Sequence, residues 1–346
     1  MLNATLGLVG NLAWIALVVL GIPSCGKNEV LGGGDNPIPV AFHAAPEGDA
    51  TTKADGTYVA PGNHYLPDNS YFGVFAFYQE AVGGDDPATW AYTPRTPNFM
   101  FNQPVAFDGE HYSYSPLSYW PSGTSNTVSF WAYYPHDANH LPYAENLAFV
   151  ESDGTTPYSA SSTGLPHATY TVVSKTAPDY QQDLMFSNLA EDKTYYNCTP
   201  THGTVPLTFS HALALVEFRL QALGTVTAFS VSNLYWSGTC ENPANISWTD
   251  LSGLDAFSMA PVSWSTTQPK TLTCILMPQT LREEAKLNIT ATGISDPNVA
   301  IKGAGGITAW LPGKHYVYYI TAGIIVNVIT TEWEEVPAET PGIQIQ

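Results

Sequence analysis

Apolar and polar residues alternate along many short segments of this chain, and this alternation is the strongest constraint on its fold. The segment TVSFWAYYP, which ends at Pro135, is an example. Val128 and Phe130 fall on one face of an extended chain, whereas Trp131 and Tyr133 fall on the other. A period of two residues is typical of a β-strand and does not suit an amphipathic helix. We therefore predict a strand whose aromatic side chains lie mainly inside a β-sandwich.

The same pattern recurs throughout the chain, and the composition supports it. Strands are predicted at residues 38–42, 70–78, 205–220, 271–278, 286–292, 315–321 and 324–329. The 28 glycines and 27 prolines supply turns between strands, and the 20 tyrosines and 9 tryptophans favour strands over helices. Residues 155–182 are expected to form loops with irregular strands. Many short strands separated by turn residues predict an all-β fold of sandwiches or barrels.

The length of the chain predicts two domains. Domains commonly contain roughly 100–200 residues, and this chain has 346. We place the boundary near His202–Gly203, just before the strand that contains Leu207. Within that strand segment, Phe209 and Val216 fall in opposite apolar phases. A bulge or a short helical turn near His211 would account for the change of phase.

The charge of the chain excludes one class of partner. Eleven Lys and Arg residues against 30 Asp and Glu residues give a formal net charge of -19. Phosphate backbones repel such a chain, so we do not expect a nucleic acid as partner.

The first 36 residues resemble an export signal followed by a flexible tether. The apolar run Leu12–Ile22 suits the h-region of a signal peptide. The residues before Cys25 resemble a bacterial lipobox, which implies a signal peptide at 1–24, lipidation of Cys25 and a lipidated tether at 25–36. The alternative is an uncleaved membrane anchor, since residues 1–24 contain no Lys or Arg. Both interpretations place the mature chain outside the cytoplasm and attached to a membrane.

The remaining cysteines predict neither a metal site nor a defined disulfide. Cys198, Cys240 and Cys274 are an odd number, so at most two of them can pair within one chain. Their spacing does not choose the pair, and it does not suggest zinc.

The segment YWPSGTSNTVSFWAYYP is one of several longer motifs in this chain. It resembles the YWP…V-x-F-x-AYYP element of the fimbrillin family, whose members are lipoproteins of Bacteroidetes that build type V pili. Other segments match family elements in the same order: TYVAPGNHYLPDNSYFGVFAFY, QQDLMFS, PLTFSHALALVEFRL, ILMPQTL, WLPGKHYVYYIT and TTEWEE. Together these segments span about residues 38 to 334.

The resemblance implies a fold, a function and partners. The fold would be two tandem transthyretin-like β-sandwich domains at 37–203 and 204–346, the second with a possible donor tail. The protein would be a structural or adhesive subunit of a cell-surface pilus, or fimbrium, anchored in the outer membrane by its lipid. Its partners would be other pilus subunits, in a homopolymer or heteropolymer, and a host or bacterial surface ligand.

In this family, subunits assemble by strand exchange after proteolysis, and the sequence offers residues for each role. Ile38, Val40 and Phe42 would form the strand that is removed. Lys53 is the expected cleavage point, because it is the only basic residue between the first two predicted strands; the alternative is an ordinary solvated lysine. At the chain end, isoleucines 343 and 345 alternate with glutamines, which suits either a donor strand or a frayed terminus.

No catalytic, metal or cofactor site is predicted. His136 and His140 have a spacing that would suit a metal on a helix, but they follow Pro135 in a loop-like context. His211 is expected to be a buried histidine with a satisfied partner rather than a base. No common nucleophile, metalloprotease or nucleotide-binding motif is present. We therefore predict that the protein is not an enzyme.

Two other functions remain as alternatives. The first is a surface lipoprotein that binds glycans and does not polymerise, with sugar-stacking rings among Trp90, Tyr92, Trp236 and Trp248. The second is a secreted hydrolase whose site the motifs do not reveal.

Overall fold

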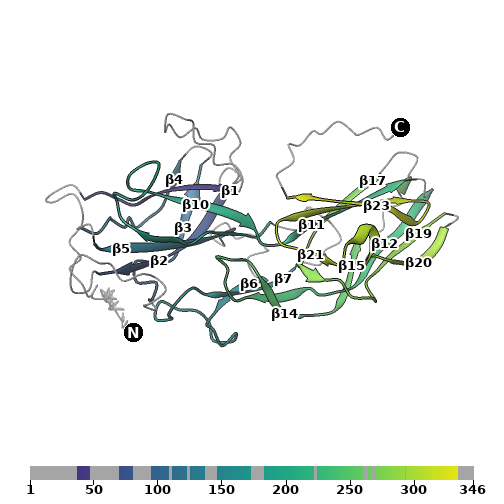
Figure 1. Cartoon of the computed structure of the whole chain (residues 1–346), viewed down its shortest axis with the longest axis horizontal. Coiled ribbons are helices and arrows are strands. Elements are labelled where there is room, and N and C mark those ends of the chain that lie inside the picture. The colour runs from purple at the N-terminus through teal and green to yellow at the C-terminus, as the bar shows by residue number, and fades with distance from the viewer. Residues whose placement is uncertain are drawn as a thin grey trace, which may run out of the picture.

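The secondary structure is almost entirely β, as the sequence predicts. The computed structural model describes residues 37–46, 70–80, 95–108, 111–122, 125–136, 146–172, 183–221, 224–259, 264–265, 270–292 and 294–333. Within these ranges, the 3-10 turn at Ala304–Gly306 is the only helical element that is described in full. In the same ranges, no helix has the length and apolar character needed to span a membrane. Figure 1 shows an elongated molecule with one group of strands around β2 and β5 and another around β11 and β12.

The first sheet contains eight strands in the order β1-β10-β8-β5-β2-β3-β4, with β9 paired to β5. Only the pair of β1 and β10 in this sheet is parallel. The strands are β1 (Ala41–Pro46), β2 (Ser70–Gln79), β3 (Met100–Phe107), β4 (Tyr112–Ser113), β5 (Thr127–Tyr134), β8 (Met185–Ser187), β9 (Ala190–Lys193) and β10 (Thr204–His211).

Three further sheets lie in the part of the molecule around β11 and β12. One has the order β17-β11-β22-β23, the second has the order β15-β12-β19-β20 with β16 also on β12, and a small third one pairs β18 with β21. The strands are β11 (Ala214–Gln221), β12 (Thr225–Leu234), β15 (Asp255–Met259), β16 (Trp264–Ser265), β17 (Lys270–Leu276), β18 (Gln279–Thr280), β19 (Lys286–Ala291), β20 (Ile294–Ala300), β21 (Ala309–Trp310), β22 (Lys314–Thr321) and β23 (Ile324–Glu332).

A four-stranded sheet joins strands from both halves of the sequence. Its order is β14-β13-β7-β6. The strands are β6 (Leu147–Val150), β7 (His167–Thr171), β13 (Ser237–Cys240) and β14 (Trp248–Ser252). Figure 1 shows β6, β7 and β14 below the junction of the two strand groups. The expected loop region at 155–182 therefore contributes one regular strand, β7, to a ladder with a distant segment.

The sheets do not divide at the boundary expected from the sequence. We predicted that the strand containing Leu207 opens the second domain, but this strand is β10, which pairs with β1 and β8 in the first sheet. After His211 the chain leaves the first sheet and enters β11, whereas β7, earlier in the sequence, pairs with β13 later in it. This change of sheet also accounts for the opposite apolar phases of Phe209 and Val216, so the pattern does not depend on a bulge within one strand.

Two clusters of buried side chains pack on opposite faces of β2 and β5. Val128 and Phe130 belong to the cluster that also contains Val40 and Phe42, which we call the β1 cluster. Trp131 belongs to a larger cluster, the central cluster, that continues into the sheets around β11 and β12. Every residue of β5 is buried, so the predicted two-sided strand is confirmed.

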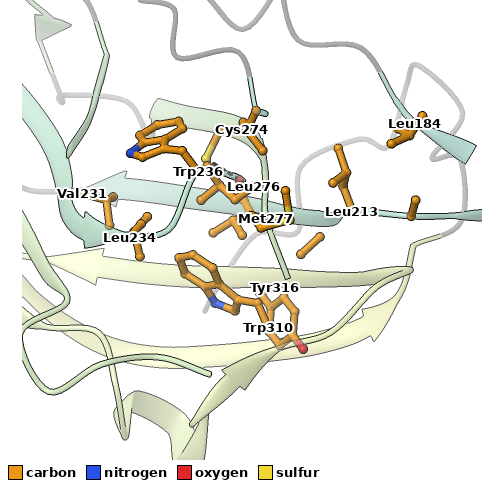
Figure 2. Close-up of a cluster of buried hydrophobic side chains, with 14 of the residues drawn as sticks. Leu184, Leu213, Val231, Leu234, Trp236, Cys274, Leu276, Met277, Trp310 and Tyr316 are labelled. Carbon is orange, nitrogen blue, oxygen red and sulfur yellow. Dashed lines mark hydrogen bonds between the residues drawn. The ribbon is translucent and has the colours of Figure 1, made fainter. Parts of the chain in front are cut away.

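The central cluster is assembled from strands and connections of several sheets. Figure 2 shows Trp236 and Trp310 on either side of Leu276 and Met277. Trp310 donates a hydrogen bond from Nε1 to the hydroxyl of Tyr318, at 2.9 Å. A buried indole N–H therefore has a partner, which removes the desolvation cost of leaving it unpaired.

Candidate functional site

Strand β1 lies at one end of the first sheet and pairs with a segment far away in the sequence. Its parallel register on β10 runs from Ala41 opposite Thr204 to Pro46 opposite Phe209. The amide N of Ala41 also lies 3.1 Å from the carbonyl oxygen of Gly203, to which it donates a hydrogen bond. A strand bound in this way is attached by backbone hydrogen bonds and side-chain burial, and no hairpin joins it to β10.

The other edge of β1 contacts the segment around residues 112–120. The amide of Val40 donates to the carbonyl of Ser118 at 2.9 Å, and the amide of Trp120 donates to the carbonyl of Ile38 at 3.0 Å. Pro39 and Tyr119 form an isolated antiparallel bridge between these two bonds. Backbone hydrogen bonds therefore hold β1 on the β10 side and the residues just before β1 on the opposite side.

Two tyrosines next to Ser118 strengthen this second edge. The Tyr114 hydroxyl donates to the carbonyl of Val40 at 2.9 Å, and the Tyr112 hydroxyl donates to the carbonyl of Ala44 at 3.0 Å. Burial raises the pKa of both tyrosines to about 12. Each hydroxyl therefore keeps its proton at neutral pH and remains a hydrogen-bond donor to β1.

One face of β1 is buried in the β1 cluster. The exposed fractions of Val40, Phe42 and Ala44 are 2%, 5% and 7%, and Ile38 packs against the same cluster while partly buried. The Phe42 ring makes edge contacts with three rings, those of Phe72, Tyr114 and Phe130, with centroids 5.6–6.1 Å apart. The structure therefore places Ile38, Val40 and Phe42 on one apolar face, with the alternation that the sequence predicts.

The other predicted site residues lie outside the described residues. They are Cys25 for lipidation, Lys53 for processing, and Ile343 and Ile345 for the donor strand.

The sequence analysis did not identify the residues that close the second edge of β1. Tyr112 and Tyr114 alternate with serines in the segment YSYS, which is the signal of a short strand with two tyrosines on one face. Their partners are carbonyls of a distant strand, so no local pattern predicts the hydrogen bonds. Trp120 adds a further link, because its Nε1 donates to the carbonyl of Gly203 at 2.9 Å.

Strand β23 ends next to the last residues of β10. The Trp333 ring stacks on the His211 ring with centroids 4.1 Å apart and an interplanar angle of 7°. His211 Nδ1 lies 2.7 Å from Asp183 Oδ2, and the amide of Trp333 donates to the carbonyl of Gly313 at 2.8 Å. His211 is a half-buried residue with a carboxylate partner and a ring partner, which fits the structural role predicted for it.

The candidate sugar-stacking tryptophans that the structure describes are engaged in packing. Trp236 is 6% exposed within the central cluster. Trp248 packs against the same cluster and donates from Nε1 to the carbonyl of Ala212 at 2.6 Å. Trp236 is thus buried in the core and Trp248 is partly buried against it, while the other two candidates, Trp90 and Tyr92, lie outside the described residues.

The three cysteines of the folded part are separate, buried thiols. Cys198, Cys240 and Cys274 form no disulfide. Burial raises the pKa of Cys198 and Cys240 to about 11 and that of Cys274 higher still. Thiols with raised pKa values in apolar surroundings are poor nucleophiles, so all three have a packing role.

Comparisons with known proteins place this arrangement in a family. No curated protein sequence matches the chain. Among solved structures, a fimbrial protein from Bacteroides vulgatus has a TM-score of 0.54 and 17% identity, covering 86% of this chain and all of the other. A Bacteroides uniformis protein provisionally assigned to cell adhesion has a TM-score of 0.50 and 18% identity, covering 86% of this chain and 98% of the other.

These structural similarities concern the fold, and the sequence comparison adds the family. A Bacteroides ovatus protein with the same provisional assignment has a TM-score of 0.52 and 15% identity, covering 87% of this chain and 97% of the other. The fimbrillin-like family matches residues 52–333, which is most of the sequence. The chain therefore belongs to the fimbrillin-like family.

Proposed function

We propose that this protein is a structural or adhesive subunit of a cell-surface pilus, exported as a lipoprotein and assembled by proteolysis-triggered strand exchange. Membership of the fimbrillin-like family supports a pilus or adhesin subunit that assembles with other subunits at the cell surface. The single observation that carries the finer mechanism is the way β1 is bound. This strand joins the first sheet without a hairpin and buries one apolar face.

Removal of β1 would leave a slot that another strand can fill. Its loss would expose the edge of β10, the Ser118 carbonyl and the apolar sites now filled by Val40, Phe42 and Ala44. An incoming strand with apolar residues at alternate positions would restore both the ladder and the burial. Burial of Val40 and Phe42 contributes about 3–6 kcal/mol by the usual range for such side chains, so the refilled slot would be strongly favoured.

Two segments of the chain fit the remaining roles. Cleavage after Lys53 would separate β1 from the chain that follows. The tail that contains isoleucines 343 and 345 has alternating apolar residues that would suit the emptied slot of a neighbouring subunit. Lipidation of Cys25 would hold the subunit at the outer membrane. We also propose two sandwich domains, with the border after His211 because β10 belongs to the first sheet.

The first experiment tests cleavage. We expect purified protein treated with a trypsin-like protease to lose β1 and form ordered oligomers, measured by electron microscopy and size-exclusion chromatography. Lys53→Ala should prevent both. A clipped protein that stays monomeric would contradict strand exchange and favour the alternative of a non-polymerising, glycan-binding lipoprotein.

A second experiment separates cleavage from strand release. Ala41→Cys with Thr204→Cys places two cysteines at opposed positions on β1 and β10. After oxidation, we expect cleavage at Lys53 to proceed while β1 stays bound and polymerisation stops. Reduction should restore polymerisation, and this serves as the matched control because the protein is the same. Polymerisation of the oxidised, cleaved protein would show that β1 does not have to leave.

The membrane anchor is tested separately. We expect Cys25→Ala to abolish incorporation of a labelled fatty acid in cells and to release the protein from the outer-membrane fraction. Retention in that fraction without the label would instead support an uncleaved amino-terminal anchor.

A further inference from the structure

A pocket of about 320 Å³ lies where β1, β10 and the start of β4 meet. Its walls combine the seam between two parallel strands with a turn that precedes β10. The lining residues are Phe42, His43, His111, Tyr112, Thr199, Pro200, Thr201, Thr204 and Pro206. The volume is at the small end of the range of about 300–1,000 Å³ for ligand pockets, which suits one or two sugar-sized rings.

The lining favours a neutral, hydroxyl-rich ligand. Among the described residues, the nine that line the pocket include no Lys, Arg, Asp or Glu, so none of these side chains offers a fixed charge to an anion or a cation. Within the described part of the chain, the hydroxyls of Thr199, Thr201 and Thr204 have no hydrogen-bond partner and can bind a ligand. Each hydroxyl can both donate and accept, as sugar hydroxyls also do.

The same pocket has apolar surfaces beside these hydroxyls. Phe42, which lines the pocket, is 5% exposed, and the Tyr112 ring lies next to the His43 ring with centroids 6.4 Å apart. Burial lowers the pKa of His43, which keeps its imidazole neutral at pH 7. Apolar rings next to free hydroxyls match a sugar ring, which has C–H faces and polar edges.

The turn that precedes β10 also carries a group of aromatic rings. Tyr196 is 51% exposed, and its ring centroid lies 5.2 Å from that of Tyr195 and 6.3 Å from that of His202. His202 lies between the pocket residues Thr201 and Thr204 in the sequence. The turn therefore carries both hydroxyls that line the pocket and, a few residues away in the sequence, an exposed aromatic group.

We propose that this pocket binds a neutral saccharide unit and that the bound sugar stabilises the pairing of β1 with β10. Phe42 and His43 belong to β1, so the pocket is complete only while β1 is bound. A ligand that binds only the complete pocket stabilises that state by mass action. When the free sugar concentration is nine times Kd, opening of β1 should become about tenfold rarer. The inference goes beyond pilus assembly and does not require it.

The test uses the intact, unprocessed protein, so a failure of polymerisation cannot affect it. The probes are the methyl glycosides of glucose, galactose, mannose and N-acetylglucosamine, titrated into the millimolar range by NMR. We expect at least one to cause saturable shifts at Thr199–Thr204 and His43. Hydrogen exchange of residues 37–46 should slow by about tenfold at nine times the measured Kd.

Matched variants localise the effect. Thr201→Val removes a pocket hydroxyl at an exposed position and should weaken binding at least several-fold. Thr208→Val makes the same change on the face of β10 that carries Thr204, but outside the pocket lining, and should leave Kd unchanged. Four outcomes would each overturn the proposal. They are no binding of any of the four glycosides, equal Kd values for the two variants, unchanged exchange of β1 at saturation, and an affinity for glucuronate equal to that for the neutral glycosides.

Discussion

Strand β1 and strand β23 are the first and last described strands of the chain, and they are held in different ways. β1 pairs with distant residues of β10 and buries alternate side chains. β23 forms a hairpin with β22 through the turn residues Ala322 and Gly323, whose φ values are 51° and 84°. Positive φ values at both central positions are typical of the tight turn that suits a two-residue hairpin.

The burial of the two strands differs as much as their connections. Val40, directly before β1, and Phe42 within it are at most 5% exposed, whereas Ile324, Val326 and Ile329 of β23 are 42–59% exposed. β1 thus has strong side-chain contacts and no local covalent link to its partner, while β23 has a local link and weaker contacts. A strand of the first kind can leave and be replaced without unfolding a hairpin, which is the property that strand exchange requires.

The largest expected effect comes from the ring of Phe42. Phe42→Ala deletes a buried ring that contacts Phe72, Tyr114 and Phe130. We expect a loss of about 3–5 kcal/mol in the free energy of β1 opening, which corresponds to exchange about two to four orders of magnitude faster. Hydrogen exchange of residues 37–46 measures this loss. A change below about tenfold would mean that burial does not hold β1.

A matched valine pair compares the strands directly. Val40→Ala and Val326→Ala delete the same atoms from positions that are 2% and 54% exposed. We expect losses of about 2–3 kcal/mol for the first and within about 0.5 kcal/mol for the second, each measured by hydrogen exchange of its own strand. Equal losses would contradict the difference between the two strands.

The contact between the end of β23 and β10 should have an intermediate effect. Trp333→Ala removes the ring stacked on His211 and leaves the His211–Asp183 pair in place. We expect a loss of about 1–2 kcal/mol at the end of β23, because a stacked aromatic pair contributes about 0.5–1.5 kcal/mol beyond burial. Trp333→Phe should recover most of it. Faster exchange throughout β1 in Trp333→Ala would show that the two strands are coupled through β10.

The sequence predicts the strands of this protein better than their partners. The alternation around Phe130 and Trp131 correctly predicts a strand buried on both faces, because side-chain period depends only on local geometry. The alternation around Leu207 did not show which sheet its strand joins. We expected this strand to open the second domain, but it pairs with β1 and β8 in the first sheet, because a period of two shows which face is buried and not which strand lies alongside. Tyr112 and Tyr114 were missed for a related reason: their acceptors are carbonyls of a distant strand.

The surroundings of the two strands should lose stability in different pH ranges. Burial lowers the pKa of His43 on β1 below its ordinary value of 6.5, so the unfolded chain binds the proton more readily. This contribution to stability is present above pH 6.5 and is lost as the pH falls through the folded pKa. We expect exchange of residues 37–46, corrected for intrinsic rates, to accelerate below pH 6.5. His43→Gln should remove this acceleration; if it persists, another group is responsible, and His111 and Tyr112 face the same pocket.

The sheet that contains β23 should respond only at lower pH. Burial alone would raise the pKa of Glu217, but hydrogen bonds and charges from His315 and Arg219 outweigh it and lower the pKa below its ordinary value of 4.5. The stability that this group contributes is present above pH 4.5 and is lost as the pH falls through the folded pKa. Exchange of β11 and β22 should therefore begin to accelerate below pH 4.5 in the wild type, and this acceleration should be smaller in Glu217→Gln. Equal acceleration in both proteins would contradict the assignment to Glu217.

The smallest expected effect concerns the ion pair between β22 and β23. Lys314 and Glu332 face each other across the ladder and their side chains are in contact, with exposed fractions of 31% and 67%. Water screens a pair this exposed, so Glu332→Gln should cost less than about 0.5 kcal/mol in a urea unfolding experiment, and less still at high salt. The hairpin turn and the half-buried Ile325 and Val328 then hold β23 in place. A loss above about 1 kcal/mol that disappears in salt would instead make β23 a strand fixed by charge, and would weaken the contrast with β1.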